Sequence, residues 1–200
     1  LYSSAASDVY KRQADYSGFP ENETDKVFII LDKMDKIGLD GVREELLAEG
    51  YAPEAVEKYT GLLAEIQNDA AGVRALGEKL SGVMDPAKAE NLATIMETVK
   101  AVADIEFGLE FDPTLVRGMG YYTGTIFEVS MEGFGGSVAG GGRYDKMVGK
   151  FTGNDVPACG FSIGFERIIM LLMERGFKVP TRPKQVAYLI EKGVSGERLC

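Results

Sequence analysis

The chain has 200 residues, of which 45% are hydrophobic and 26% are charged, with 22 basic and 31 acidic side chains and a net charge of −9. This composition fits one good-sized globular domain or two small ones, and it excludes disordered and collagen-like chains. The acidic balance argues against nucleic-acid binding by these residues alone, and the absence of histidine excludes Ser-His-Asp catalysis and histidine-ligated metals within the chain.

The first thirteen residues, LYSSAASDVYKRQ, begin without methionine and show no periodic apolar face. They resemble translated adaptor sequence. We therefore predict a non-native leader at residues 1–13 and leave it out of the predicted fold.

Residues 14–104 are predicted to form an α-helical module. Apolar side chains at helical spacing predict a first helix that stops at Gly38, and these are Val27, Ile30, Leu31, Met34 and Ile37. A second helix is expected over residues 40–49 and a third from Pro53. Asp85 followed by Pro86 predicts another helix start, an N-cap and then a first-turn proline. We interpret the apolar faces of these helices as core packing, with acidic faces in solvent.

The period changes from about residue 105. Ile105, Phe107, Leu109 and Phe111 alternate with other residues, and the segment 122–131 is rich in Thr, Ile, Phe and Val, so both are predicted strands. Gly133–Gly136 is expected to turn between antiparallel neighbours. The pattern predicts an α+β fold, an antiparallel sheet with helices on one side. No GxxxxGK[ST] or strand-to-helix GxGxxG motif is present, so a nucleotide would have to be held by arginines and open backbone.

The segment LVRGMGYYTGTIFE at 115–128 is the first candidate for a binding site. Arg117 is cationic at any working pH and offers a planar fork of donors to a carboxylate or phosphate. Gly118 and Gly120 leave room for a ligand beside the backbone, and Tyr121 and Tyr122 offer apolar walls with hydroxyl tips. The same segment also fits a glycine turn with two core tyrosines.

Two further segments carry the same character. VAGGGRYDKMVGKF at 138–151 has three glycines before Tyr144, which suit either a tight turn or a ligand against main-chain amides. PACGFSIGFERIIMLLMERG at 157–176 passes through Gly164 into a helix that we expect to be buried nearly all round. Arg167 on that helix then needs an anionic partner, either a carboxylate of this chain or a bound polyphosphate.

Together and in this order, the three segments resemble the histidine-tRNA ligases (histidyl-tRNA synthetases), a family of class II aminoacyl-tRNA synthetases. RGMGYYTGTIFE resembles the family's signature stretch, GGGRYDKMV its glycine-rich pocket strand and helix, and GFSIGFERI the third class II motif. DKVFIILDKMDKIG at 25–38 is similar to the start of its helical insertion domain. The resemblance covers about residues 17–190.

The resemblance implies a class II synthetase-like antiparallel sheet with flanking helices, present in part, plus the insertion module. It assigns 14–104 to the insertion domain and 105–178 to the second half of the catalytic domain. Residues 179–200 become a linker and the first strand, KQVAYLI at 184–190, of a truncated anticodon-binding domain.

The resemblance also implies roles for single residues. Arg117 is the expected catalytic cation, lying against the histidine carboxylate and the ATP α-phosphate. Tyr121, Tyr122 and Tyr144, with Arg117, are expected to bind histidine. Gly164 and Arg167, with Arg117, are expected to bind ATP, with Mg²⁺ accompanying it and no metal held by this chain. Many members carry aspartate where this chain has Gly120, so whatever that carboxylate contacts is absent here or supplied differently.

The implied activity joins L-histidine to ATP as an adenylate and passes it to tRNA(His), in a homodimer. We expect this chain alone to be inactive, because class II motifs 1 and 2 have no counterpart in it. One alternative is the synthetase paralogue that regulates ATP phosphoribosyltransferase and charges no tRNA; it usually lacks the helical insertion. Another is a histidine-binding module without chemistry, in which missing strands would leave an open sheet edge.

Two observations concern location. Apolar stretches fall far below the roughly 18 residues of a membrane span, and the first residues lack the order of a secretory signal, so we expect a cytoplasmic protein without membrane contact. The two cysteines have neither disulfide-framework nor metal-ligand spacing. Cys159, between Ala158 and Gly160, is expected to be a small buried side chain.

Overall fold

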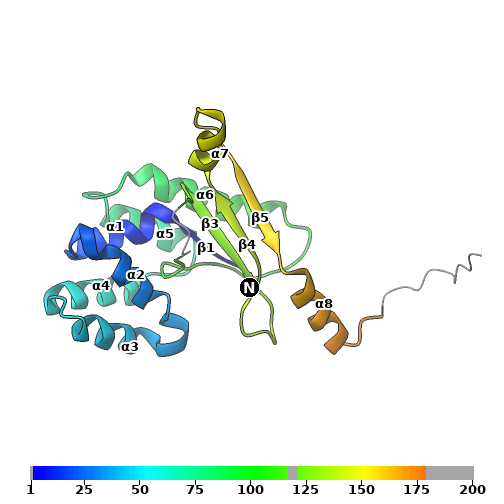
Figure 1. The fold of residues 1–200 in the computed structure, drawn as a ribbon, viewed down its shortest axis with the longest axis horizontal. Helices are drawn as coiled ribbons and strands as arrows, with labels where there is room; N and C mark the ends of the chain where they lie inside the picture. Colours follow the sequence, from blue (N-terminus) through cyan, green and yellow to red (C-terminus); the bar gives the residue numbers. More distant parts are fainter. Residues whose placement is uncertain (1, 117–120, 179–200) are drawn as a thin grey trace, which may run out of the picture.

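In the part of the chain that the structure describes, five strands form one sheet in the order β2-β1-β3-β4-β5. The computed structural model describes residues 2–116 and 121–178, with residues 2–8 described by their backbone only (Figure 1). The strands are β1 (Tyr2–Ala6), β2 (Leu109–Phe111), β3 (Thr125–Ser130), β4 (Ser137–Arg143) and β5 (Cys159–Ile163). Neighbouring strands are antiparallel except β1 and β2, which run parallel. The predicted α+β class is confirmed, whereas the expected strand 184–190 lies outside the described residues.

The N-terminal segment is part of this fold. The strand β1 pairs with both β2 and β3, and the helix α1 (Ser7–Ser17) follows it directly. Val9 and Tyr10 of this segment are buried, and with Ala14, just beyond it, they form the buried face of α1. Leaving residues 1–13 out of the predicted fold therefore omitted one strand and most of a helix. Their non-native origin stays a prediction.

Helices gather on the β1–β2 side of the sheet, while α7 and α8 lie at the two ends of β5 (Figure 1). After the 3-10 turn Glu21–Glu23, the helices are α2 (Thr24–Leu31), α3 (Met34–Ala48), α4 (Pro53–Glu65), α5 (Ala70–Lys79), α6 (Pro86–Val102), α7 (Asp145–Thr152) and α8 (Phe165–Glu174). The predicted starts at Pro53 and Pro86 are confirmed. The Asp85 carboxylate accepts a hydrogen bond from the Ala87 amide at 3.0 Å, as an N-cap does.

The helix expected over residues 25–38 is divided into two. α2 ends at Leu31, and α3 begins at Met34 and bends at Gly38, which has φ 70° and ψ 176°. A positive φ favours glycine, and these angles are not helical, so the helical run stops at Gly38 as predicted. A second helical stretch then extends to Ala48, which confirms the helix expected over residues 40–49. The periodic apolar residues were correct, since Val27, Ile30 and Leu31 are buried. Periodicity alone did not reveal the break.

The buried apolar side chains form one continuous cluster. It extends from the helices α1–α6 to Phe111, Leu115 and Ile126 beside and within the sheet. At its centre the Phe19 ring packs edge-to-face against Tyr51 at 5.2 Å and Tyr59 at 5.3 Å between centroids. The helices and the sheet therefore share a core, while the domain boundaries drawn from the sequence stay predictions.

The strand β5 and the helix α8 are largely exposed. Phe161 keeps 68% of its surface and Phe165 keeps 66%, and Leu171 is the buried residue of α8. The expectation that α8 is buried all round is wrong, because no described element covers its outer side. The expectation for Cys159 is also wrong, because this residue begins the outer strand β5 and is exposed.

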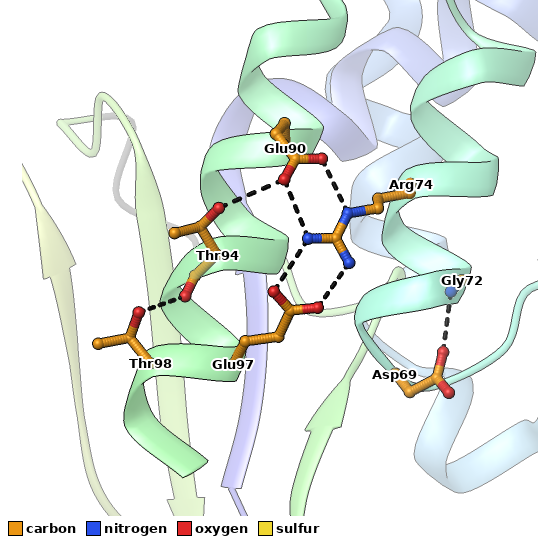
Figure 2. A network of polar contacts seen from close by, with 7 residues as sticks. All are labelled: Asp69, Gly72, Arg74, Glu90, Thr94, Glu97 and Thr98. Carbon is orange, nitrogen blue, oxygen red and sulfur yellow. Dashed lines mark hydrogen bonds and ion pairs between the residues drawn. The ribbon is translucent and has the colours of Figure 1, made fainter. Parts of the chain in front are cut away.

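A guanidinium joins α5 to α6. Figure 2 shows Arg74 between two carboxylates, with Nε and Nη2 donating to Glu90 at 2.8 and 2.9 Å. Nη1 and Nη2 donate to Glu97 at 2.6 and 3.0 Å. The hydrogen bonds from Arg74 lower the pKa values of both carboxyl groups, and the two carboxylates raise the pKa of Arg74. Paired forks of this kind are the geometrically best surface ion pairs.

We predict that Arg74→Met lowers the melting temperature more at pH 7 than at pH 3. Glu90 and Glu97 have pKa values below the ordinary carboxyl value of about 4.3, so their stabilisation is present above that pH and is lost as the pH falls through the lowered values. Circular dichroism melts at the two pH values measure it. Arg43→Met, which removes a pair with the single carboxylate of Glu57, is the control and should cost less at pH 7. Equal losses for Arg74→Met at both pH values would contradict the assignment.

We predict that Tyr59→Phe leaves the free energy of unfolding unchanged or raises it by up to about 1 kcal/mol. The Tyr59 side chain is fully buried, its hydroxyl has no hydrogen-bond partner among the described residues, and burial raises its pKa. An unpaired buried hydroxyl stabilises nothing, whereas the ring fills the core, so Tyr59→Ala should cost about 3–5 kcal/mol. Urea unfolding of both variants measures these changes. A loss above 1 kcal/mol in Tyr59→Phe would reveal a partner for the hydroxyl.

Candidate functional site

Three predicted pocket tyrosines come together at one end of β3 and β4. Tyr121 and Tyr122 precede β3, and Tyr144 follows β4. The ring centroids lie 4.4 Å apart for Tyr121 and Tyr122, 6.0 Å for Tyr121 and Tyr144, and 6.5 Å for Tyr122 and Tyr144. The hydroxyl oxygens of Tyr121 and Tyr122 are 3.2 Å apart. These half-buried rings form an apolar wall that carries hydroxyl groups, and we name them the tyrosine cluster.

Glycines make room for the tyrosine cluster on the sheet. Gly142 of β4 pairs with Gly160 of β5, so both face the same side. A side-chain carbon on Gly160 would collide with the Tyr144 hydroxyl, and one on Gly142 would lie 2.9 Å from the Tyr122 ring. The sheet therefore presents bare backbone where these rings lie.

Arg167 lies at the other end of β4. Its Nη1 donates to the Ser137 carbonyl oxygen at 2.5 Å, and its guanidinium carbon lies 5.8 Å from the Phe134 ring centroid. Gly164, which precedes α8, donates its backbone N–H to the Val138 carbonyl oxygen at 2.7 Å. Arg167 pairs with no carboxylate among the described residues, whereas a bound polyphosphate stays a prediction. Because the Arg167 side chain is exposed, its charge does not require a partner from this chain.

The tyrosine cluster and Arg167 lie at opposite ends of β4. They are about 23 Å apart along this strand, because seven steps of about 3.3 Å separate Ser137, which Arg167 contacts, from Tyr144. Gly140 and Gly142 of β4 and Ser162 of β5 face the same side between them. We name this face of β4 and β5, from the tyrosine cluster to Arg167, the strip. It offers aromatic rings at one end and a cation at the other. It can accept an elongated ligand with a planar group and an anionic group.

A cavity of about 810 Å³ adjoins the Arg167 end of this strip. It lies between the α2–α3 region and the β3–β4 turn, and its lining includes Phe134 and Ser137, the two residues that contact Arg167. Its described lining has five carboxylates and no lysine or arginine; the carboxylates are Asp32, Asp35, Glu110, Asp112 and Glu128. This lining suits cationic or neutral groups and repels free phosphates.

Arg117, the predicted catalytic cation, lies outside the described residues together with Gly118 and Gly120. Val116, which precedes Arg117, lines the cavity. Tyr121, four residues after Arg117, belongs to the tyrosine cluster. The described part of the chain thus brings Tyr121, Tyr122 and Tyr144 together and places Gly164 and Arg167 at the other end of β4. The roles of all these residues stay predictions.

The sequence analysis missed the polar residues that hold the tyrosine cluster. Thr123, Arg143 and Asp145 are hydrogen-bonded to one another around Tyr144. The available signal was that each is a direct neighbour of a predicted pocket tyrosine in YYT or RYD. Arg143 and Asp145 are two positions apart, but Thr123 lies at least twenty positions from both, so its contacts with them were not visible from sequence spacing.

The family model described as histidyl-tRNA synthetase matches residues 5–168. The chain belongs to the histidyl-tRNA synthetase family. A histidine–tRNA ligase of Leifsonia xyli subsp. xyli is 45% identical over 163 residues, 78% of this chain and 37% of the relative. The crystal structure of histidyl-tRNA synthetase from Nostoc sp. PCC 7120 has a TM-score of 0.69 and 29% identity, covering 90% of this chain and 43% of that chain.

A third relative shares the fold alone. The structure of an ATP phosphoribosyltransferase regulatory subunit/histidyl-tRNA synthetase from Bacillus halodurans C has a TM-score of 0.64 at 22% identity and covers 86% of this chain. The chain spans less than half the length of the Leifsonia xyli and Nostoc relatives. No helix within residues 2–116 and 121–178 combines the length and apolar character needed to cross a lipid bilayer.

We predict that Gly160→Ala lowers the free energy of unfolding by about 1–3 kcal/mol, because its methyl group meets the Tyr144 hydroxyl. Gly160→Ala combined with Tyr144→Phe should recover part of that loss, since the hydroxyl is then absent. Urea unfolding of the single and double variants measures the coupling. Gly61→Ala, on an open face of α4 with no atom near the added carbon, is the control and should stabilise by up to about 1 kcal/mol. Additive losses would show that Tyr144 is not packed on Gly160.

Proposed function

We propose that this chain is part of an ATP-dependent histidine–tRNA ligase of class II. The observation that carries the proposal is the strip on β4 and β5, with the tyrosine cluster at one end and Arg167 at the other, in a member of the histidyl-tRNA synthetase family. Histidine supplies a planar imidazole and a carboxylate, and ATP supplies an elongated anion. The strip offers a complementary group to each.

Histidine recognition is proposed to occur at the tyrosine cluster. The phenolic hydroxyls of Tyr121, Tyr122 and Tyr144 can donate to or accept from the two imidazole nitrogens. A buried hydroxyl left unpaired by the wrong amino acid costs free energy, so hydrogen bonding of this kind discriminates strongly. The ring faces provide apolar contact on either side of the imidazole.

Activation is proposed to join the two ends of the strip. A carboxylate oxygen of histidine attacks the α-phosphorus of ATP, a P–O bond forms, and pyrophosphate leaves with the electron pair of the broken bond. Arg117 is proposed to stabilise the charge on the α-phosphate oxygens, and Gly164 and Arg167 are proposed to hold the rest of the nucleotide. The Phe134 ring already supports the Arg167 guanidinium from one side.

The Mg²⁺ that accompanies ATP would be held mainly by phosphate oxygens and water, which is the usual environment of this ion. Magnesium would supply charge neutralisation on the leaving phosphates. The residues of this chain would orient the reacting carboxylate.

Transfer to tRNA(His), a homodimeric assembly and a cytoplasmic location are also part of the proposal. Residues 14–104 contain nineteen acidic and nine basic side chains, a net charge of −10, whereas residues 105–200 contain eleven of each. Phosphate backbones bind to basic surfaces. The tRNA is therefore proposed to be held mainly by parts of the protein other than this helical module.

We predict histidine-dependent exchange of pyrophosphate into ATP by the protein made from the complete reading frame that encodes this chain. The expected result is turnover with histidine and none with the other nineteen amino acids, measured with labelled pyrophosphate. The 200-residue chain alone should show none, because motifs 1 and 2 have no counterpart in it. Histidine binding without exchange by the complete protein would favour the regulatory paralogue.

Two variants of the complete protein separate the ends of the strip. Tyr144→Phe should raise the KM for histidine about tenfold, by loss of one hydrogen bond, with the KM for ATP little changed. Arg167→Met should raise the KM for ATP and leave the KM for histidine little changed. Tyr16→Phe is the control for the tyrosine, and Arg175→Met is the control for the arginine because it also lies beside α8 and donates to a carbonyl, that of Glu132 at 2.8 Å. Parallel changes in both KM values would contradict the proposed division.

A further inference from the structure

A closed circuit of hydrogen bonds surrounds Tyr144. The Thr123 amide donates to the Arg143 carbonyl oxygen at 2.8 Å, and the Asp145 amide donates to the Thr123 hydroxyl oxygen at 3.0 Å. The Tyr144 amide donates to the Ala158 carbonyl oxygen at 2.8 Å. The Ala158 amide in turn donates to Asp145 Oδ1 at 3.0 Å. Both neighbours of Tyr144 are therefore tied to Thr123, and Tyr144 and Asp145 are tied to Ala158.

The circuit joins the three segments that supply the tyrosine cluster and the glycines on which its rings pack. Thr123 directly follows Tyr121 and Tyr122, Ala158 comes two residues before Gly160, and Tyr144 lies between the other two bonded positions. These segments are separated by about twenty and by fourteen residues of chain. Without cross-links their relative positions would depend on sheet pairing alone, and Tyr122 and Tyr144 lie just outside the strands.

Asp145 is the centre of this circuit. Besides the Ala158 amide, its carboxylate accepts from Arg143 Nε at 3.0 and 2.9 Å, and three-quarters of its side chain is withdrawn from solvent. The Ala158 amide and then Arg143 lower the pKa of the carboxyl group, so it remains ionised and accepts from both donors at neutral pH. Asp145 also begins α7, where a carboxylate is favourable.

We infer that Asp145 and Thr123 are positioning residues that set the spacing of Tyr121, Tyr122 and Tyr144 and thereby determine selectivity for the bound amino acid side chain. They touch no proposed reacting atom. They act by fixing the tyrosine hydroxyls against the positions of the two imidazole nitrogens. This inference rests on the proposed function for its ligand, and on the hydrogen-bond circuit for its geometry.

The test uses four variants of the 200-residue chain labelled with 3-fluorotyrosine. Thr123→Val removes the hydroxyl at nearly constant shape, and Thr123→Ser restores it. Asp145→Ala removes both acceptors, and Asp145→Asn keeps one oxygen for the Ala158 amide. Fluorine NMR reports the three ring environments, calorimetry reports histidine affinity, and thermal melts report folding. Tyrosine signals are assigned with single Tyr→Phe variants.

We expect Thr123→Val and Asp145→Ala to shift or broaden the signals of Tyr121, Tyr122 and Tyr144 and to weaken histidine binding at least tenfold at a temperature where both variants are folded. Thr123→Ser should retain the original spectrum and affinity, and Asp145→Asn should lie between. Tyr51 and Tyr59, in the helical core, should keep their signals throughout and serve as internal controls.

Either of two results overturns the inference. The first is an unchanged spectrum for the tyrosine cluster in Thr123→Val and Asp145→Ala, which would show that the circuit does not position the rings. The second is a changed spectrum with unchanged histidine affinity, which would show that the spacing does not set selectivity. A further outcome is that the two variants alter the spectrum but the unsubstituted chain binds no histidine. The positioning role is then supported. The selectivity role is overturned together with the proposed histidine site of this chain.

Discussion

The approach of tyrosine rings to bare backbone on β4 and β5 is the constraint on which the rest of the site depends. Gly142 and Gly160 face each other across the two strands and leave no side chain beneath Tyr122 and Tyr144. A flat hydroxyl-bearing wall can therefore lie on the sheet itself. Everything else at this end, including the Thr123–Asp145 circuit, holds the rings in that place. At the other end of β4, Arg167 gains its position from a carbonyl and a ring.

Local signals in the sequence predicted local structure well. Pro53 and the Asp85–Pro86 pair begin helices where expected, because capping and first-turn geometry depend on neighbouring residues alone. The turn at Gly133–Gly136 separates β3 from β4 for the same reason. The break after Leu31 was not predicted, because an apolar stripe continues across it and the backbone at residues 32 and 33 stays in the right-handed helical region.

Features that depend on distant segments were predicted poorly. The apolar stripe of α8 suggested burial, but burial requires a partner surface, and no described element supplies one for Phe165 or Ile169. Resemblance to a family brought Tyr121, Tyr122 and Tyr144 into one predicted pocket, and the ring distances place them together. The circuit through Asp145 joins residues up to 35 positions apart, so no spacing rule could have revealed it.

The outer strand β5 carries a cysteine whose labelling can report whether the edge of the sheet is covered. Gly164 and Ala158 hydrogen-bond toward β4, and residues alternate along a strand, so the peptide groups of Cys159, Phe161 and Ile163 point the other way. Cys159 thus lies on an edge of the sheet that no strand of the described residues pairs with, and it is exposed. With Cys200 replaced by serine, the rate at which a thiol reagent labels Cys159 would measure how much of the time any other polypeptide covers this edge.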